Sequence, residues 1–373
     1  MTTHAKSLSR RKFLKASAVT AGAAASATVA MPQVSRAQTV TWKYQSTWPT
    51  KDIFHEFAVD YAKKVNDMSG GRLKLDVLAA GAVVPAFQVQ DAVHSGVLDG
   101  GHGVTVYWYG KNKAASLFGT PPSMGWDAHS LLAWFYHGGG EALYNELIND
   151  ILKINAVGFL YYPMPNQPLG WFKKEIKNAD DFKGMKYRTV GLSADLFKEM
   201  GAAVTILPGG EIVPAIDRGL IDGAEFNNPS SDLLLGFPDV SKNFMVRSHH
   251  QQGECFELSF NKAKFNALAP ELKSILRYAA LAATADQFYM AHDRYSKDLE
   301  AIRARGVNVI KTPDSVLEAQ LKAWDTVIAA NKDPYFVKVL ESQRAWCKRV
   351  VPYFLTNNLT TAQQETAYKH FFG

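Results

Sequence analysis

One short pattern occurs twice in this chain, and it limits the folds that the chain can adopt. Residues 92–102 read AVHSGVLDGGH, and residues 215–225 read AIDRGLIDGAE. In each copy a stretch with helical spacing of apolar residues leads to a glycine, two apolar residues and Asp-Gly. A glycine at this place is typical of a helix that ends in a left-handed turn. The pattern therefore predicts the same helix–turn–strand unit in two separate parts of the chain.

The residues after each copy are the first candidates for a binding site. A short buried strand is expected to begin at Val97 and at Leu220, directly after the helix. In open α/β sheets, ligands bind beyond the carboxyl ends of the strands. Residues 102–109 and 225–228 emerge at those ends. They are therefore predicted to face one crevice from two sides.

Helices and strands alternate in both halves of the chain, which predicts an α/β protein with two lobes. Besides the repeat, strands are expected at 40–44, 73–77 and 185–190. Two more, at 157–162 and 256–260, are expected to cross between the lobes. We expect lobe I to contain residues 38–163 plus about 254–285. We expect lobe II to contain residues 164–253 plus about 286–373, including C-terminal helices.

A long helix is predicted at residues 270–305. Proline stands in its first turn, and Gly306 follows its last residue. A helix of this length extends about 54 Å, which is longer than one lobe. We therefore expect it to join the two lobes.

The first 37 residues predict an export signal. Arg10 and Arg11 begin a twin-arginine pattern, a small apolar run follows at 16–30, and 35–37 is a small-x-small cleavage site. A membrane anchor is disfavoured because the run is shorter than the roughly 20 residues that span a bilayer. We therefore expect a periplasmic protein exported by the twin-arginine route.

The charge of the exported part argues against two classes of partner. The chain has 41 basic and 35 acidic side chains, and six of the basic ones lie in the signal. The remaining 35 of each sign give no electrostatic basis for binding nucleic acid or anionic lipid. The cysteines Cys255 and Cys347 have the option of pairing in an oxidising periplasm. We expect two separate buried thiols instead.

The stretch FKGMKYRTVGLSADLFKEMGAAVTILPGGEIVPAIDRGLIDGAEFNNP, residues 182–229, resembles the core of DctP-type solute-binding proteins of TRAP transporters. The order of GMK, the MGA turn at 200–202 and G-x-x-D-G-x-E at 219–225 carries the resemblance, which extends over nearly the whole exported chain. It implies a two-lobe periplasmic binding protein fold and no enzyme activity. It also implies capture of a small organic monocarboxylate, a 2-oxo or 2-hydroxy acid, for TRAP membrane permease subunits.

The carboxylate-binding arginine of the family falls on Arg188. A planar guanidinium offers two parallel donors that match a carboxylate, and lysine does not. From the residues alone, an exposed arginine at a strand end would be the preferred interpretation, and the family motif around Arg188 favours the binding role. Gln167, together with the neighbouring Asn166, matches a family setting in which the glutamine touches both a metal ion and the ligand. An amide that only fixes a turn before Pro168 is the alternative.

The resemblance also implies a metal site. Glu225 matches a metal ligand, and Phe226, where relatives have tryptophan, would offer its backbone carbonyl. A third ligand, usually glutamate, falls by count on Gln251, with Gln252 one step away, and Gln167 completes the set. Because Ca²⁺ usually needs more anionic charge than one glutamate supplies, the options are Na⁺, a weak Ca²⁺ site or no ion. No organic cofactor is implied.

Further ligand contacts are expected from two segments. Asn227 and Asn228 each have an amide that can donate to a ligand oxygen, but asparagine before proline is also an ordinary turn signal, and we expect one of the two to be only that. Tyr107, Trp108 and Tyr109 bring three aromatic rings to the crevice, of which we expect one or two to cover the ligand. His102 receives no ligand role.

Three functional questions stay open in the sequence. Replacement of tryptophan by Phe226 and of glutamate by Gln251 leaves room for a bulkier or aromatic carboxylate. A periplasmic enzyme using the same cleft would have Glu225 as its candidate base, because no Gly-x-Ser-x-Gly elbow or serine–histidine–acid set is found. A ligand sensor linked to a receptor is the third possibility. A homodimer through residues 353–372 is a further expectation from the resemblance.

Overall fold

Each copy of the repeat supplies one strand to a separate β-sheet. The computed structural model describes residues 39–373, which form both sheets. The predicted signal peptide, residues 1–37, lies outside the described residues. The first sheet has the order β2 (Leu73–Leu78), β1 (Val40–Ser46), β3 (Gly100–Val104), β10 (Glu254–Asn261) and β4 (Ala156–Met164). The second has the order β11 (Asn308–Lys311), β9 (Asn243–Val246), β5 (Gly170–Phe172), β8 (Gly223–Ala224), β6 (Lys186–Arg188) and β7 (Ala203–Thr205).

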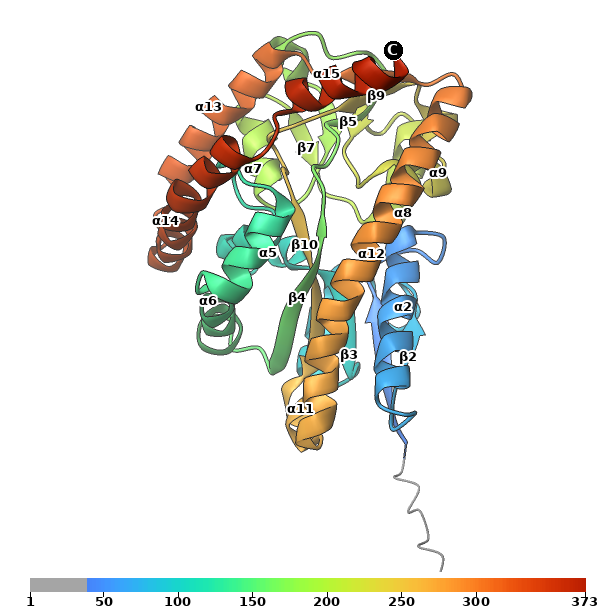
Figure 1. Ribbon diagram of the computed structural model, residues 1–373, viewed down its shortest axis with the longest axis vertical. Helices are drawn as coiled ribbons and strands as arrows, with labels where there is room; N and C mark the ends of the chain where they lie inside the picture. The colour runs from blue at the N-terminus through green and yellow to red at the C-terminus, as the bar shows by residue number, and fades with distance from the viewer. Residues whose placement is uncertain (1–38) are drawn as a thin grey trace, which may run out of the picture. The chain divides into compact units, whose positions relative to one another are not determined.

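Helices cover both sheets (Figure 1). The helices before β5 are α2 (Ile53–Met68), η1 (Ala86–Gln88), α3 (Val89–Ser95), η2 (Thr105–Trp108), η3 (Lys113–Ala115), α4 (Ser116–Gly119), α5 (Ala128–His137), α6 (Gly140–Glu146) and η4 (Leu147–Ile151). Those after β5 are η5 (Ala179–Phe182), α7 (Leu192–Glu199), α8 (Gly209–Asp217), α9 (Pro229–Leu235), α10 (Phe237–Val240), α11 (Lys262–Ala267), α12 (Pro270–Ala304), α13 (Asp314–Ala330), α14 (Pro334–Asn357) and α15 (Thr361–Phe372). The mixture of helices and two sheets confirms the predicted α/β class.

The two copies of the repeat have the predicted helix and turn. Helix α3 ends at Gly96, which has φ +81°, and α8 is followed by Gly219, which has φ +74°. Both values lie in the left-handed region that glycine adopts at little cost. The predicted helix end is therefore confirmed in both copies.

The predicted start of the strands is wrong. Val97 and Leu220 are 53% and 59% exposed and lie in the turn, and the strands begin later, at Gly100 and Gly223. The turn includes these residues because its aspartate is hydrogen-bonded to the neighbouring strand of the sheet. In the first copy Asp99 exchanges two hydrogen bonds with Lys43 of β1: its N–H donates to the Lys43 carbonyl at 2.9 Å, and its carboxylate accepts from the Lys43 N–H at 2.6 Å.

The second copy repeats this anchor. The N–H of Asp222 donates to the carbonyl of Lys186 on β6 at 2.7 Å, and its carboxylate accepts from the Lys186 N–H at 3.1 Å. Strand β3 lies parallel to β1, and β8 lies parallel to β6. The two copies therefore deliver the residues that follow them to the carboxyl ends of two parallel strand pairs.

Two long strands and one long helix connect the sheets. β4 and β10 pair antiparallel in the first sheet; the chain enters the second sheet shortly after β4 and returns from it into β10. Helix α12 has 35 residues and packs against β4, α2 and α9. Figure 1 shows it in orange, running past both sheets. The prediction of one helix joining both parts of the chain is confirmed.

The cysteines, the helices and the end of the chain have three further features. Cys255 and Cys347 are both buried and unpaired, as predicted. Within residues 39–373, no helix is both long and apolar enough to cross a membrane. Helix α15 has no buried residue, so the end of the chain adds nothing to the core.

Candidate functional site

A cavity of about 10 Å³ lies where the two copies of the repeat end. Its walls come from both sheets and from the segment that leads into β10. The lining residues are Trp48, Val104, Tyr107, Arg188, Val190, Glu225, Phe226, Asn227, Gln251 and Glu254. One guanidinium and two carboxylates thus share a space with aromatic and aliphatic walls.

Arg188 is the only basic side chain among these lining residues of the described chain, and it is 1% exposed. Its Nε donates to the carbonyl of Leu207 at 2.9 Å, and its Nη1 donates to both the carbonyl (3.1 Å) and the carboxylate (2.9 Å) of Glu225. These bonds use three of the five guanidinium donors. The burial of Arg188 contradicts the alternative of an exposed arginine.

Oxygen atoms gather on the Glu225 side of the cavity. The amide nitrogen of Gln167 contacts both the carboxylate of Glu225 and the carbonyl of Phe226. Its amide oxygen is buried and has no hydrogen-bond partner in the described part of the chain. If the Gln167 amide is rotated by 180°, its oxygen, a carboxylate oxygen of Glu225 and the Phe226 carbonyl oxygen face one point. Oxygen atoms of these kinds are the ligands that Na⁺ and Ca²⁺ take in proteins. The residues present therefore fit a hard cation.

The two carboxylates have perturbed acidities. Burial raises the pKa of Glu225, and the charge of Arg188 opposes that rise. Burial, together with the charge of Glu225, raises the pKa of Glu254 to about 8. The cavity thus holds two carboxyl groups and one guanidinium, so one positive charge cannot balance both carboxyl groups when they are ionised.

The three asparagines of the predicted site lie in different surroundings. Asn227 lines the cavity, and its amide nitrogen is buried without a partner in residues 39–373. Asn228 instead caps α9, accepting hydrogen bonds from the N–H groups of Ser230 and Ser231, both at 3.0 Å. Asn166 donates to the Ser248 carbonyl at 2.9 Å and lies with Asn228 on a different cavity. The structure brings Asn227 to the site, but neither Asn166 nor Asn228.

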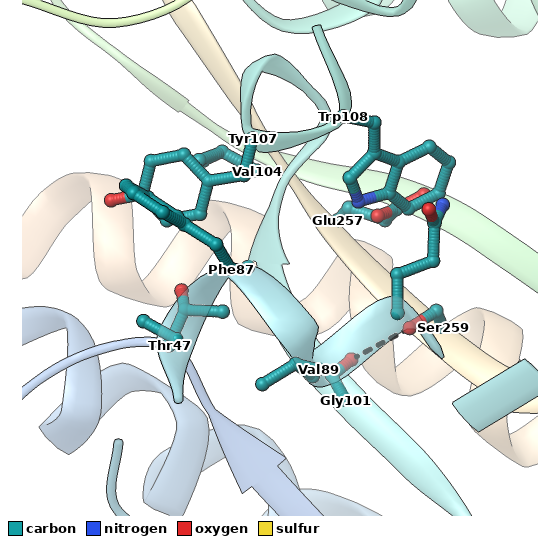
Figure 2. Close-up of a pocket in the computed structure, with 12 residues that line it drawn as sticks. Thr47, Phe87, Val89, Gly101, Val104, Tyr107, Trp108, Glu257 and Ser259 are labelled. Atoms are coloured by element: carbon teal, nitrogen blue, oxygen red, sulfur yellow. Dashed lines mark hydrogen bonds between the residues drawn. The ribbon is translucent and has the colours of Figure 1, made fainter. Parts of the chain in front are cut away.

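The aromatic residues of η2 also separate. Tyr107 lines the site, whereas Figure 2 shows Trp108 on the far side of β3, beside Glu257 and Ser259. Tyr109 donates to Asp195 at 2.7 Å and lines an adjoining cavity. Tyr107 is therefore the member of this segment that faces the buried charges.

Gln251 lines the cavity, and Gln252 does not. The carbonyl of Gln251 accepts from the Gln167 N–H at 3.1 Å, which holds the two segments together. The side chain of Gln252 instead accepts a hydrogen bond from Ser123. Of the two neighbouring glutamines, the structure thus brings Gln251 to the predicted set.

The predicted set lacked Trp48 and Glu254. Trp48 follows β1, so the rule that predicted Glu225 from the end of β8 also points to it. Its indole N–H donates to Nδ1 of His102 at 3.0 Å. Burial lowers the pKa of His102 to about 3, so the ring is neutral and its other nitrogen bonds to Tyr161. His102 supports the wall of the cavity without lining it.

A second, apolar cavity adjoins the site. It has a volume of about 280 Å³, is partly open to solvent and shares Tyr107 and Val190 with the charged cavity. The residues around it are Phe87, Val106, Tyr107, Tyr109, Gly110, Val190, Gly191 and Ile206. A ligand held at Arg188 therefore has an apolar space beside it.

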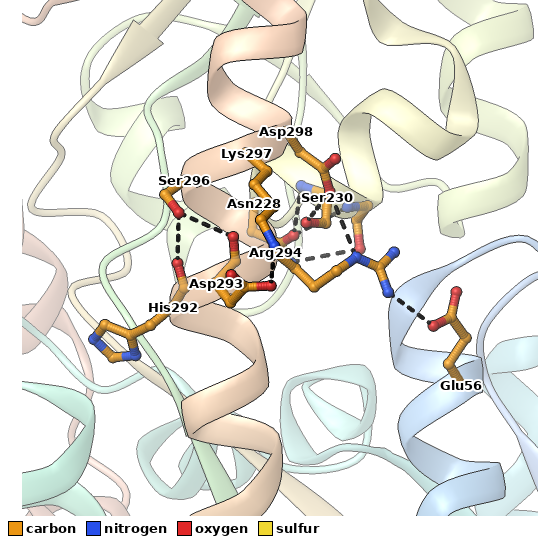
Figure 3. A network of polar contacts seen from close by, with 10 residues as sticks. Glu56, Asn228, Ser230, His292, Asp293, Arg294, Ser296, Lys297 and Asp298 are labelled. Carbon is orange, nitrogen blue, oxygen red and sulfur yellow. Dashed lines mark hydrogen bonds and ion pairs between the residues drawn. The ribbon is translucent and has the colours of Figure 1, made fainter.

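Polar contacts fix the segment after Glu225 to the rest of the molecule. Ser231 donates to Asp52, the cap of α2, at 2.7 Å, and Ser230 donates to Asp298 of α12 at 2.5 Å. Figure 3 shows Ser230 and Asp298 beside Arg294, which pairs with Glu56 of α2 at 3.2 Å. Helix α9 thus connects the site to α2 and α12.

Comparisons with known proteins agree on one type of protein. The family model described as bacterial extracellular solute-binding protein, family 7 (DctP), matches residues 44–333. A monocarboxylate 2-oxoacid-binding periplasmic protein of a Nostoc species is 30% identical over 359 residues, covering 95% of this chain and 98% of that protein.

Two solved structures of TRAP solute-binding proteins share the fold. One, from Bordetella bronchiseptica, is a dimer with calcium and picolinate in one site and the other site empty; it has a TM-score of 0.83 and 25% identity and covers 90% of this chain and 98% of its own. The other, from Pseudoalteromonas atlantica, holds sodium and pyruvate; it has a TM-score of 0.81 and 29% identity and covers 90% of this chain and all of its own.

Proposed function

Because this chain belongs to the bacterial extracellular solute-binding protein family 7, we propose that it captures a small monocarboxylate in the periplasm for TRAP permease subunits. The ligand class is a 2-oxo or 2-hydroxy acid. The observation that supports this proposal most directly is Arg188, a guanidinium buried in a cavity between the two sheets. A buried cation is stable only when it is paired. Its Nη2 takes no part in the bonds to Leu207 and Glu225, so the two N–H groups of Nη2 remain to donate to an oxygen of a ligand carboxylate.

The walls of the cavity favour a small acid group with an apolar substituent. The charged cavity has a volume of only about 10 Å³, close to the room that one water needs, so it is matched to a small polar group. The adjoining apolar cavity extends it past Tyr107 and Val190. We infer an acid that is longer than pyruvate or carries a ring. The picolinate in the Bordetella relative is an acid of the second kind.

A cation site beside the acid is part of the proposal. Glu225, the carbonyl of Phe226, Gln167 and Gln251 are the groups that would hold Na⁺ or Ca²⁺. When bound, the ion supplies positive charge next to the acid oxygens. The two relatives described above hold calcium or sodium together with their acid.

Capture is proposed to occur by closure of two lobes with the boundaries given above, 38–163 plus about 254–285 and 164–253 plus about 286–373. Arg188 and Glu225 follow strands of the second sheet, and Trp48 and Tyr107 follow strands of the first. Only the closed form brings both groups to the ligand, so the ligand favours closure. Small-angle scattering should show a smaller radius of gyration with ligand.

Export and assembly complete the proposal. Twin-arginine export is inferred from residues 1–37. A homodimer is inferred from apolar side chains that are 60–75% exposed near the end of the chain: Tyr353, Leu355, Leu359, Tyr368, Phe371 and Phe372. Exposed apolar side chains that gather in this way are typical of protein interfaces. Sedimentation of the exported form tests this state.

The deciding experiment is native mass spectrometry of protein purified without added ligand, followed by calorimetry with the acid it releases. Binding without turnover of that acid supports a receptor. Chemical conversion of the acid would instead support an enzyme with Glu225 as its base. Failure of every 2-oxo and 2-hydroxy acid to bind would contradict the proposed function.

A further inference from the structure

We propose that Glu254 is the second anionic ligand of the cation site and makes it selective for a divalent ion such as Ca²⁺. The proposal rests on the receptor function above and assigns a role to a residue outside the predicted set. It also changes the role of Gln251, the residue that the sequence resemblance assigns to this ligand. Gln251 becomes a neutral neighbour of the site.

The first argument is charge balance. Nη1 of Arg188 lies 2.9 Å from a carboxylate oxygen of Glu225, so these two charges already offset each other. A divalent cation and an acid monoanion would then leave one net positive charge in the cavity. A buried net charge is costly. One more carboxylate makes the sum zero, and Glu254 is the other carboxylate among the described residues that line this cavity.

The second argument is position. Glu254 is 3% exposed and begins β10, where it pairs with Met164 at the end of β4. Gln167 follows Met164 by three residues, and its N–H bonds to the Gln251 carbonyl at 3.1 Å. The segments that carry Gln167 and Glu254 are therefore adjacent. Glu225 and Phe226 line the same cavity from the other side.

The third argument comes from atoms that need a ligand. The amide oxygen of Gln167 is fully buried and has no partner in residues 39–373. The amide contacts both Glu225 and the Phe226 carbonyl, so this oxygen belongs to the same small group of donors. A neutral oxygen, a backbone carbonyl and two carboxylates form a donor set suited to Ca²⁺, whereas Na⁺ needs fewer anions.

The test uses Ca²⁺ alone. Chain treated with chelator and exchanged into sodium-free buffer is titrated with Ca²⁺ by calorimetry, for wild type, Glu254→Gln and Glu257→Gln. Glu257 is a matched control, since it is also 3% exposed, lies on the same strand and bonds to Tyr144 away from this cavity. We expect one Ca²⁺ per chain, a loss of affinity of about tenfold or more in Glu254→Gln and less than about twofold in Glu257→Gln.

The outcomes separate the two proposals. Equal Ca²⁺ affinity in wild type and Glu254→Gln, or no Ca²⁺ binding by wild type, overturns the role of Glu254. Binding of the acid by wild type is measured separately in sodium buffer. If wild type does not bind the acid in that buffer, the result counts against the receptor function and not against the role of Glu254. A second measurement uses wild type alone and so does not depend on how the variant folds. Wild type should keep Ca²⁺ in an excess of Na⁺. Displacement of Ca²⁺ by Na⁺ would also overturn the role of Glu254.

Discussion

Replacing Arg188 by lysine should abolish acid binding and leave the fold intact. Lysine keeps the positive charge beside Glu225, so the buried carboxylate is not left unpaired. It has one nitrogen where arginine has three. That nitrogen cannot reach the Leu207 carbonyl, Glu225 and a ligand carboxylate at the same time, because these acceptors surround different guanidinium atoms.

The magnitude follows from the bonds that are lost. Two charge-assisted hydrogen bonds to the acid contribute about 1.5–3 kcal/mol each. Losing both weakens binding by about 3–6 kcal/mol, or roughly 150- to 25,000-fold. The Arg188→Ala variant should in addition be less stable by about 3–5 kcal/mol, because it leaves Glu225 buried without its partner. The two substitutions thus separate binding from folding.

The assay is calorimetry with the acid identified by mass spectrometry, together with thermal unfolding of each variant. Arg218→Lys is the matched control, since Arg218 is exposed and bonds only to a carbonyl of its own helix, Pro214, at 3.0 Å in the described structure. Wild-type affinity in Arg188→Lys, with the fold intact, would refute the role of the guanidinium. Equal losses in Arg218→Lys would show that the effect is not specific to the site.

Three further results are expected. Asn228→Ala should lower stability by about 1 kcal/mol through loss of the α9 cap and leave acid affinity unchanged. Asn227→Ala should instead weaken acid binding without changing the melting temperature. The reverse pattern would contradict both assignments. Affinity should rise about fourfold for each methylene added to pyruvate, at about 0.8 kcal/mol per group, and a flat series would show that the apolar cavity is not used. Burial raises the pKa of Glu257 from 4.5 to about 8, so folding favours its protonated form; the stability that this provides is complete below pH 4.5 and is lost as pH rises toward 8. The melting temperature of Glu257→Gln should therefore fall less than that of wild type between pH 5 and 8, and parallel curves would contradict the assignment.

The repeat made the main parts of the fold predictable, because its signals are local. Gly96 and Gly219 mark helix ends through their own backbone preference, and the carboxyl ends of the strands follow from that. The start of the strands was misplaced since Val97 and Leu220 are apolar yet exposed. Apolar character alone does not separate a turn residue from a strand residue when an aspartate anchors the turn to another part of the chain.

The site was predictable where a charged side chain stands at the carboxyl end of a strand, as for Arg188 and Glu225. Asn227 and Asn228 have the same side chain, and only the direction of the backbone decides which one caps α9. Glu254 was missed because it is the first residue of a strand and not one that follows a strand. The first residue of a strand lies at the same edge as the last residues of a neighbour that runs antiparallel to it, as β3 does to β10, so the start of β10 reaches the site as well.

The buried state of Cys255 and Cys347 makes this chain convenient for measuring ligand capture. Burial raises the pKa of both thiols, which keeps them protonated and slow to react. These are the two cysteines of the whole sequence. A cysteine introduced at Ile206, a 44% exposed residue at the rim of the apolar cavity, would be the one thiol open to a fluorescent dye. The native background would thus serve as an optical sensor for organic acids without removal of either cysteine.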